Sequence, residues 1–534
     1  MGAAVQAAET EAGGPEDGNR REKLVVFAST LGTVFEWYDF FIYGTLAGII
    51  GRLFFPTDNA SLQFLLALAS FAIGFGFRPL GAVVFGYLGD KFGRKYTFLA
   101  TIVIMGVATA GVGLVPSFAT IGVAAPIIIV TLRILQGLAL GGEFGGAAVY
   151  VAEHAPPKKR GFYTSFIQGS VGAGFVLSIL AVIGTRYAVG EEAWNDWGWR
   201  VPFLFSLVLL GISIWIRLML HESPVFQKMK AKGEVVQNPL KEAFRAPGNF
   251  KMIMVALFGL MAGTTVIWYT SMFQMLYFLQ NALRVDENTA QAMVGLGAFA
   301  GLGMFIFCGW LSDKVGRKPL ILLGYVGALL LTFPLFHWVS NEANPALAEA
   351  SRRAPIVVEG PDCSFNPFTS TQETACGALL DRVAKLNVHY TKMQGPEALV
   401  TVGGERVADT SGEGLKAALT AAGYSFETVE LTPRATLVIM AAILILGSLA
   451  ALTFGGSAAL LTEMFPSRVR YSSLSIPYNI GTGYFGGFLP FISQLIIVST
   501  GNPFSGLWYP VGMVALALVA ALIWMPETAG RDLD

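Results

Sequence analysis

Five ionisable side chains fall inside long apolar runs of the 534-residue sequence: Glu36, Asp39, Arg78, Arg133 and Glu143. A charge at the centre of a membrane helix costs at least about 2.5–3.5 kcal/mol on insertion scales, so each of these groups needs a partner or a task. Arginine stays charged, and the carboxylates outnumber the guanidinium groups. One carboxylate is therefore left without a cation, and burial favours its neutral form, which suits it to carry a proton.

Helical spacing gathers these groups on two polar faces. Asp39 follows Glu36 by three positions, and Tyr43 follows Asp39 by four, so the three share one face. Arg133 and Glu143 share a face of another helix. Lipid would penalise both faces, so both should point at a central cavity. We assign proton transfer to Asp39 first and then to Glu36, with Glu143 either a further proton site or a partner of Arg133.

The two arginines are candidates for binding an anionic substrate. The planar fork of Arg133 suits bidentate capture of a carboxylate, whereas Arg78 is expected mainly to brace a carboxylate of the protein. The alternative for all of these charges is a static buried ion pair that fixes helix packing. Further polar residues could line the cavity and bind substrate, although each also suits ordinary helix packing: Tyr43, Gln168, Tyr269, Gln274, Tyr478 and Asn479.

The elements that position these residues are predicted to be membrane helices. The sequence is 54% hydrophobic and 13% charged, against roughly 25% charged residues in a soluble domain. About 20 apolar residues span the hydrocarbon core, so the chain is predicted to be an all-α membrane protein. Its net charge of zero argues against a nucleic-acid partner. Twelve spans are predicted at 24–50, 62–89, 97–115, 120–150, 162–187, 201–219, 250–280, 289–311, 319–340, 434–461, 472–499 and 505–525.

The distribution of Lys and Arg predicts the orientation of these spans. One set of connections, together with both chain ends, carries far more basic residues than the other set, and the basic side is cytoplasmic. The expected location is a cell inner membrane, with both termini in the cytoplasm. The predicted domains are a tail at 1–23, a six-helix bundle at 24–219, a central cytoplasmic loop at 220–249, a second six-helix bundle at 250–340 and 434–525, an outer insert at 341–433, and a tail at 526–534.

A sequence repeat relates the two bundles. Residues 86–99 and residues 309–322 share a Gly-x-Leu-x-Asp-Lys-x-Gly-Arg-Lys pattern, and each copy joins the second and third spans of its bundle. An Asp at the end of one helix can meet the positive N-terminus of another helix, and Gly allows close approach. The alternative is a solvated loop that is basic for reasons of topology. The expected cytoplasmic gate comprises Gly86, Asp90, Gly93, Arg94, Lys95, Gly309, Asp313, Gly316, Arg317 and Lys318.

This pattern resembles the loop signature of the major facilitator superfamily. Five further segments resemble its metabolite:H⁺ symporter family: 35–43 (FEWYDFFIY), 78–81 (RPLG), 133–143 (RILQGLALGGE), and the two bundle ends at 221–226 and 526–533. The resemblance implies the major facilitator fold, with twelve helices in two pseudo-symmetric halves. It also implies proton-coupled uptake of substrates such as dicarboxylates, citrate, shikimate, proline or betaine.

The insert at 341–433 departs from the family pattern. Its strand-like pieces (356–358 and 398–402) alternate with helix-like ones (377–385 and 414–422), which predicts a small α/β domain outside the membrane, between the ninth and tenth spans. An oxidising exterior would permit a disulfide between Cys363 and Cys376, and two unpaired thiols are the alternative. Its role could be to cap the cavity, deliver substrate or bind a partner.

Three functions remain to be separated. Proton symport explains the buried charges, an uncoupled sugar-type facilitator would share the loop repeat, and a membrane receptor could sense a ligand through the insert. No nucleophile–base pair, phosphate loop or cluster with metal-ligand spacing is visible, so we expect neither an enzyme nor a metal or other cofactor. The expected partners are a small-molecule substrate, H⁺ and the lipid bilayer, with a monomeric transport unit.

Overall fold

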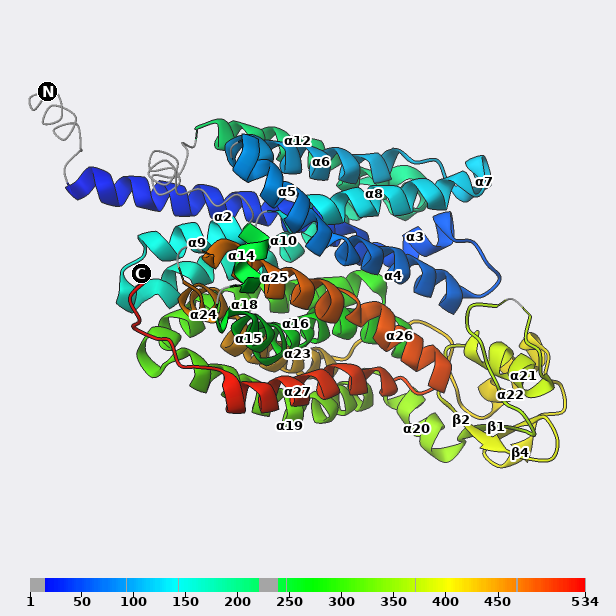
Figure 1. The fold of residues 1–534 in the computed structure, drawn as a ribbon. Helices are drawn as coiled ribbons and strands as arrows, with labels where there is room; N and C mark the ends of the chain where they lie inside the picture. Colours follow the sequence, from blue (N-terminus) through cyan, green and yellow to red (C-terminus); the bar gives the residue numbers. More distant parts are fainter. Residues whose placement is uncertain are drawn as a thin grey trace, which may run out of the picture.

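The structure is a bundle of long helices with a small mixed domain at one end (Figure 1). This computed structural model describes residues 15–92, 94–142, 144–219, 239–245, 247–369, 371–466 and 469–533. The insert lies at one end of the bundle, which we call the insert end. Helix α2 begins and the C-terminal segment finishes at the opposite end, which we call the terminal end.

The first half of the chain supplies the upper layer of helices in Figure 1. Its elements are α2 (Pro15–Thr45), α3 (Ala47–Phe54), α4 (Ala60–Gly76), α5 (Arg78–Phe92), α6 (Arg94–Leu114), α7 (Phe118–Ile121), α8 (Ala124–Gly141), α9 (Phe144–His154), η1 (Pro157–Lys159), α10 (Arg160–Val189), α11 (Glu191–Ala193), η2 (Trp194–Gly198) and α12 (Arg200–Met219). Short α14 (Pro239–Arg245) follows within the predicted central loop, most of which lies outside the described residues.

The second half supplies the lower layer and the insert. Its helices before the insert are α15 (Asn249–Met254), η3 (Val255–Met261), α16 (Ala262–Tyr269), η4 (Thr270–Gln274), α17 (Met275–Tyr277), η5 (Phe278–Ala282), α18 (Glu287–Val315) and α19 (Arg317–Ala343). After the insert come α23 (Pro433–Phe454), α24 (Ser457–Met464), α25 (Arg470–Ile480), η6 (Gly481–Gly487), α26 (Leu489–Thr500), η7 (Ser505–Leu507) and α27 (Trp508–Trp524).

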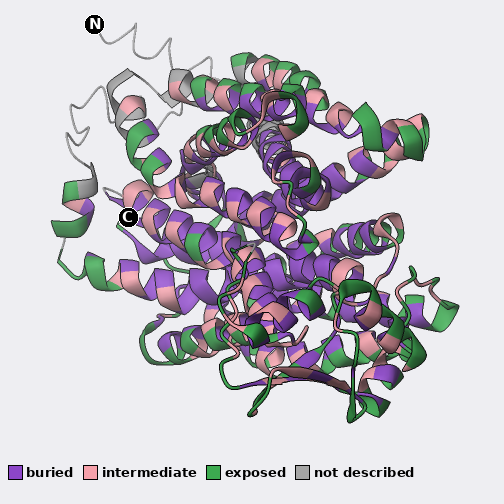
Figure 2. Cartoon of the chain, turned by 90° about the vertical axis from the view of Figure 1, so that its right-hand side faces the viewer, coloured by how far each residue is buried: buried purple, intermediate pink, exposed green. Residues whose placement is uncertain are grey.

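Length and composition identify membrane-spanning helices within the described part of the chain. Nine are long and apolar enough, or ten if the bent pair Glu191–Gly198 and Arg200–Ile216 is counted as one span. Buried residues fill the centre of the bundle, whereas large apolar side chains such as Leu330 and Leu437 face outward, as lipid contact requires (Figure 2). The total of twelve spans stays a prediction.

Two predicted spans each contain a short break between two helical segments but remain single spans, Ala60–Phe85 and Ala124–Glu153. The span predicted at 62–89 divides at Phe77 into α4 and α5, and Pro79, which lacks an N–H, stands in the first turn of α5. The span predicted at 120–150 divides at Gly142 into α8 and α9. Apolar periodicity runs through both breaks, so it does not reveal them.

The insert folds around a four-stranded sheet. Its elements are α20 (Pro345–Arg353), β1 (Ile356–Gly360), α21 (Ala375–Ala384), β2 (Tyr390–Gln394), β3 (Leu399–Val402), β4 (Glu405–Arg406) and α22 (Gly412–Ala421). The strand order is β2-β1-β3-β4, with β1 parallel to β2 and antiparallel to β3. Val358 and Val400 pack with Leu380 of α21 and Leu415 of α22 in a separate apolar core.

Glycines bring α8 against α4 and α5, and this contact positions both buried arginines. A Cβ at Gly137 would lie 1.7 Å from the carbonyl oxygen of Gly74, and a Cβ at Gly141 would lie 2.0 Å from that of Arg78. Both distances are far below van der Waals contact, so the helices meet backbone to backbone. The side chains of Arg78 and Arg133 are thereby held on neighbouring helices inside the bundle.

We predict that Gly137→Ala lowers the stability of the protein. The added methyl group must push α8 away from α4, and overpacking of this kind costs about 1–3 kcal/mol. Gly303→Ala on α18 is the matched control, because a Cβ there meets nothing within 4 Å. Thermal unfolding in detergent, followed by size-exclusion chromatography, should show a lower midpoint for Gly137→Ala and no loss for Gly303→Ala. Equal midpoints would contradict the prediction.

Candidate functional site

A chain of hydrogen bonds runs between Arg133 and the backbone of Asp39. Arg133 Nη1 donates to Gln136 Oε1 (2.5 Å), Gln136 Nε2 donates to Thr109 Oγ1 (2.7 Å), and Thr109 Oγ1 contacts the carbonyl oxygen of Asp39 (3.4 Å). Asp39 is 5% exposed and Arg133 is fully buried. Asp39 Oδ1 and Arg133 Nε and Nη2 have no hydrogen-bond partner in the described part of the chain. The site therefore contains a buried carboxyl oxygen that is free to accept a proton.

Aromatic rings enclose the Arg133 guanidinium. Its central carbon lies 4.2 Å from the ring centre of Phe40, 4.5 Å from that of Tyr43 and 5.2 Å from that of Phe71. The Tyr43 hydroxyl is itself bonded to Ser70 Oγ at 2.5 Å. Cation–π attraction of this kind is strongest where water is excluded. Arg133 is thus stabilised by rings of α2 and α4, away from the central pocket described below.

Arg78 lies at the start of α5, close to the Tyr478 hydroxyl and without an ion-pair partner among the described residues. It is fully buried, and Nε, Nη1 and Nη2 have no hydrogen-bond partner among the described residues. Its guanidinium carbon lies 5.2 Å from the ring of Trp37, 5.8 Å from that of Phe75 and 5.6 Å from that of Tyr478. Buried donors without acceptors are expensive, so Arg78 is suited to receive an anionic oxygen.

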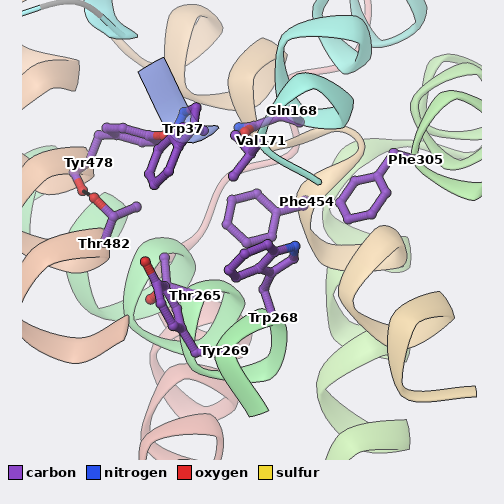
Figure 3. A pocket seen from close by; sticks show the side chains of 10 residues that line it. All are labelled: Trp37, Gln168, Val171, Thr265, Trp268, Tyr269, Phe305, Phe454, Tyr478 and Thr482. Carbon is purple, nitrogen blue, oxygen red and sulfur yellow. Dashed lines mark hydrogen bonds between the residues drawn. The ribbon is translucent and has the colours of Figure 1, made fainter. Parts of the chain in front are cut away.

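A small pocket lies between the two halves of the bundle (Figure 3). Figure 3 shows its aromatic and polar side chains converging from helices of both halves. The lining residues are Trp37, Gln168 and Val171 from the first half, and Thr265, Trp268, Tyr269, Phe305, Phe454, Tyr478 and Thr482 from the second half. Trp37 and Tyr478 also contact Arg78, so this guanidinium lies directly behind the pocket wall.

The predicted substrate-binding residues divide into two groups. Gln168, Tyr269 and Tyr478 line the pocket. Gln168 Nε2 donates to Ser457 Oγ at 2.9 Å, and the Tyr269 hydroxyl is buried without a partner among the described residues. Gln274 is buried in η4, and Asn479 Nδ2 donates to the carbonyl oxygen of Gly141 at 3.2 Å. The predicted residues that do not line the pocket are Tyr43, Arg78, Arg133, Gln274 and Asn479.

The predicted proton sites can be placed in part. Glu36 is buried in α2, one turn before Asp39. Glu143 lies outside the described residues. Sequence reasoning missed the pocket aromatics Trp37 and Trp268. Both flank predicted site residues in the sequence, but no local signal distinguishes a pocket tryptophan from one that faces lipid.

At the terminal end, Asp313 joins the two halves through the N-terminus of α10. Its Oδ1 accepts from the backbone N–H of Gly161 and its Oδ2 from that of Phe162, both at 2.8 Å. Arg317 Nη1 lies 2.8 Å from Asp313 Oδ1, and Arg317 Nη2 lies 3.2 Å from Glu463 Oε1. The carboxylate thus meets a positive helix end and a guanidinium together. Such a contact closes this end and must break if the halves separate there.

Other members of the predicted gate support this contact or lie outside the described residues. Gly309 and Gly161 pack together, because a Cβ at Gly309 would lie 2.6 Å from the carbonyl oxygen of Gly161. Gly316 has a φ of +108° at the turn between α18 and α19. In the first copy of the repeat, Gly86 lies in α5, whereas Gly93 and the side chains of Asp90, Arg94 and Lys95 lie outside the described residues.

The C-terminal segment reinforces the same turn. The Glu527 carboxylate accepts from the backbone N–H groups of Arg317 and Lys318, both at 3.0 Å. Burial acts to raise the pKa of Glu527, but hydrogen bonds from four backbone amides outweigh it, and the pKa is lowered. Two ion pairs also join the halves at this end: Arg160 Nη1 lies 3.8 Å from Glu463 Oε1, and Arg470 Nη1 lies 3.1 Å from Glu153 Oε1.

Comparison with known sequences identifies the family. The sequence pattern of the Major Facilitator Superfamily matches residues 26–351. The inner membrane metabolite transport protein YhjE of Escherichia coli is 31% identical over 520 residues, which cover 95% of this chain and 94% of that protein. This chain belongs to the Major Facilitator Superfamily.

Further relatives of this facilitator are also transporters. The proline/betaine transporter of Escherichia coli is 37% identical over 333 residues, which cover 61% of this chain and 66% of that protein. The shikimate transporter of Escherichia coli is 38% identical over 330 residues, which cover 60% of this chain and 74% of that protein. This facilitator is therefore a multi-pass membrane transporter and not an enzyme, consistent with a metabolite symporter of the superfamily.

Solved structures show the same helical fold for this facilitator. The xylose transporter XylE of Escherichia coli, in a partially occluded inward-open conformation, aligns over 96% of this chain and 99% of that one, with a TM-score of 0.61 and 16% identity. XylE bound to 6-bromo-6-deoxy-D-glucose aligns over 97% of this chain and 98% of that one, with a TM-score of 0.63 and 17% identity. At this level of identity the likeness extends to the fold.

The insert of this facilitator carries a disulfide between Cys363 and Cys376. The bond ties the loop after β1 to the first turn of α21. Within the described ranges, no group of His, Cys, Asp or Glu could hold a metal ion.

Proposed function

We propose that this protein is a proton-coupled symporter that takes up a small carboxylate-bearing metabolite by alternating access. The observation that carries the proposal is the buried guanidinium of Arg78, which has no ion-pair partner among the described residues and lies directly behind a pocket that both halves line. A substrate carboxylate would supply the acceptors that Arg78 lacks. The relatives support this substrate class, since proline, betaine and shikimate each carry a carboxylate.

Coupling to protons is assigned to Asp39. Its buried Oδ1 has no hydrogen-bond partner in the described part of the chain, and its backbone is linked through Thr109 and Gln136 to Arg133. Burial without a cation favours a neutral carboxyl group. A proton taken up on the outer side would neutralise Asp39 while the substrate carboxylate neutralises Arg78. The Asp39 carboxyl group and the Arg78 guanidinium would then both be neutralised while access changes from one side of the membrane to the other.

The orientation proposed for the protein places both termini in the cytoplasm and the insert outside the inner membrane, with twelve spans in a monomeric transport unit. The positive-inside distribution supports this orientation. The insert and the C-terminal segment also lie at opposite ends of the bundle, as this topology requires (Figure 1). The Asp313 contact then closes the cytoplasmic side.

The test is uptake by proteoliposomes with and without an inward proton gradient. Radiolabelled citrate, 2-oxoglutarate, shikimate, proline and betaine would each be offered, with xylose as an uncharged comparison. We expect one carboxylate to accumulate above equilibrium, and a protonophore should abolish the accumulation. With one proton per substrate, a gradient of one pH unit supports about tenfold accumulation, which corresponds to about 1.4 kcal/mol.

Two other outcomes would overturn the proposal. Equilibration of a substrate that ignores the gradient would establish an uncoupled facilitator, and transport of xylose but of no carboxylate would refute the substrate class. Specific binding to the isolated insert without any flux in vesicles would instead favour a receptor.

A further inference from the structure

The insert contacts both halves of the transporter at the same end of the bundle (Figure 1). Toward the second half, the contact includes backbone hydrogen bonds, from Tyr390 N–H to the Gly501 carbonyl (3.1 Å) and from Val429 N–H to the Arg284 carbonyl (2.9 Å). Chain continuity through α19 and α23 adds to them. The Lys392 ammonium also donates to the Ser499 carbonyl at 2.5 Å. These connections should make the insert move together with the second half.

Toward the first half, the insert is bound through two hydrogen bonds between side chains. Asn59 Nδ2 donates to Asp381 Oδ1 at 3.2 Å, and Ser61 Oγ donates to Asn387 Oδ1 at 3.2 Å. Asn59 and Asp381 are both buried, at 7% and 8% exposed. The insert is therefore held tightly by the second half, and only a smaller contact, which can break, holds it to the first half.

The chemistry of this contact allows it to open. Asp381 Oδ2 lies 2.7 Å from Lys385 Nζ within α21, so the carboxylate keeps a cation when Asn59 leaves. Asn59 Oδ1 accepts from the backbone N–H groups of Ser61 and Leu62, which caps α4. The contact thus acts on the first turn of the helix that leads to Arg78.

We propose that the insert is an outer latch, which travels with the second half and holds the outer side closed through Asn59 and Asp381. The proposal rests on the alternating access and the orientation given under the proposed function. When the halves separate on the outer side, the insert must release Asn59 and Ser61 while it keeps Gly501 and Arg284. The latch adds to the ion pair of Arg186 with Glu287, which also joins the halves on the outer side, whereas the Asp313 contact closes the cytoplasmic side.

The test follows the opening of the outer side without substrate or a proton gradient. Val171 lines the pocket, so the thiol in Val171→Cys reacts with a membrane-impermeant maleimide only when the pocket is open to the outside. Cys308→Ala removes the one free cysteine of the described residues, and Cys363 and Cys376 are held in their disulfide. Asn59→Asp keeps the cap of α4 but sets a carboxylate against Asp381. This substitution replaces a charge-assisted hydrogen bond by repulsion between two carboxylates, so we expect labelling at least about tenfold faster than in the parent.

Two matched variants complete the test. The exchange Asn59→Asp with Asp381→Asn restores a hydrogen bond of reversed polarity, and labelling should return to within about twofold of the parent rate. Asn502→Asp, on the same side but outside the contact between Asn59 and Asp381, adds an equal charge and keeps its own bond from Phe504 N–H; its labelling rate should not change. Equal rates in the parent and Asn59→Asp would overturn the latch alone. No labelling of Cys at 171 in any variant would overturn both the latch and alternating access.

Discussion

Replacement of Asp39 by Asn is expected to abolish accumulation driven by a pH gradient while leaving substrate exchange across the membrane intact. Asparagine fills nearly the same volume but cannot bind a proton reversibly. Asp39 is buried, with one carboxyl oxygen lacking a partner among the described residues, so no other role in packing depends on its charge. The accumulation ratio should fall from about tenfold per pH unit to unity.

The measurement compares two modes of transport in the same proteoliposomes. Net accumulation with an inward proton gradient tests coupling, whereas exchange of internal unlabelled for external labelled substrate tests binding and movement of the loaded carrier. We expect Asp39→Asn to lose the first and keep the second. Loss of both would show that Asp39 is needed for binding or folding, and retention of accumulation would exclude it as the proton site.

Glu36→Gln is the matched control, because Glu36 is a second buried carboxylate one turn away on the same helix. It should keep gradient-driven accumulation if Asp39 carries the proton. The opposite pattern, with accumulation lost in Glu36→Gln and kept in Asp39→Asn, would transfer the assignment to Glu36.

The sequence predicted the helical fold because membrane helices and the repeated loop leave strong local signals. Apolar runs are recognisable by length, and the spacing around Asp313 specifies a contact that the structure shows at the N-terminus of α10. The short breaks at Phe77 and Gly142, each inside a single span, were not predicted. Both lie inside continuous apolar runs, where hydropathy does not change.

The site was less accessible to sequence reasoning because it depends on which side chains converge. A deep charge is visible in the sequence, but its partners come from other helices. Arg133 and Arg78 look alike in this respect. The structure nevertheless surrounds Arg133 with Phe40, Tyr43 and Phe71, whereas it places Arg78 against Trp37 and Tyr478, which line the pocket. The contact of Asn59 with Asp381 is similarly invisible, since the two residues lie 322 positions apart.

Replacement of Arg78 by Lys is expected to weaken substrate binding far more than replacement of Arg133 by Lys. Lysine keeps the charge but loses the planar fork that binds a carboxylate through two parallel hydrogen bonds. Losing one charge-assisted bond corresponds to about 1.5–3 kcal/mol, so the Kd should rise about 10- to 100-fold. Arg133 is enclosed by rings outside the pocket lining, so Arg133→Lys should change the Kd by less than about threefold.

The binding measurement can use the tryptophans of the site. Trp37 and Trp268 both line the pocket, so titration of the carboxylate identified by uptake should change the tryptophan fluorescence of the purified protein. Thermal unfolding of each variant would verify that the fold is retained. A large loss of affinity in Arg133→Lys with none in Arg78→Lys would reverse the assignment and make Arg78 the structural brace.

An amide analogue of the same substrate separates a direct contact from an indirect one. If Arg78 binds the carboxylate, replacing that group by an amide should weaken binding to the parent protein by about 10- to 100-fold, and should cost little further affinity in Arg78→Gln, because the interaction is already lost. The two changes would then be strongly non-additive, as expected of groups in contact. Additive losses would show that Arg78 acts on the pocket from behind Trp37 and Tyr478, without touching the substrate.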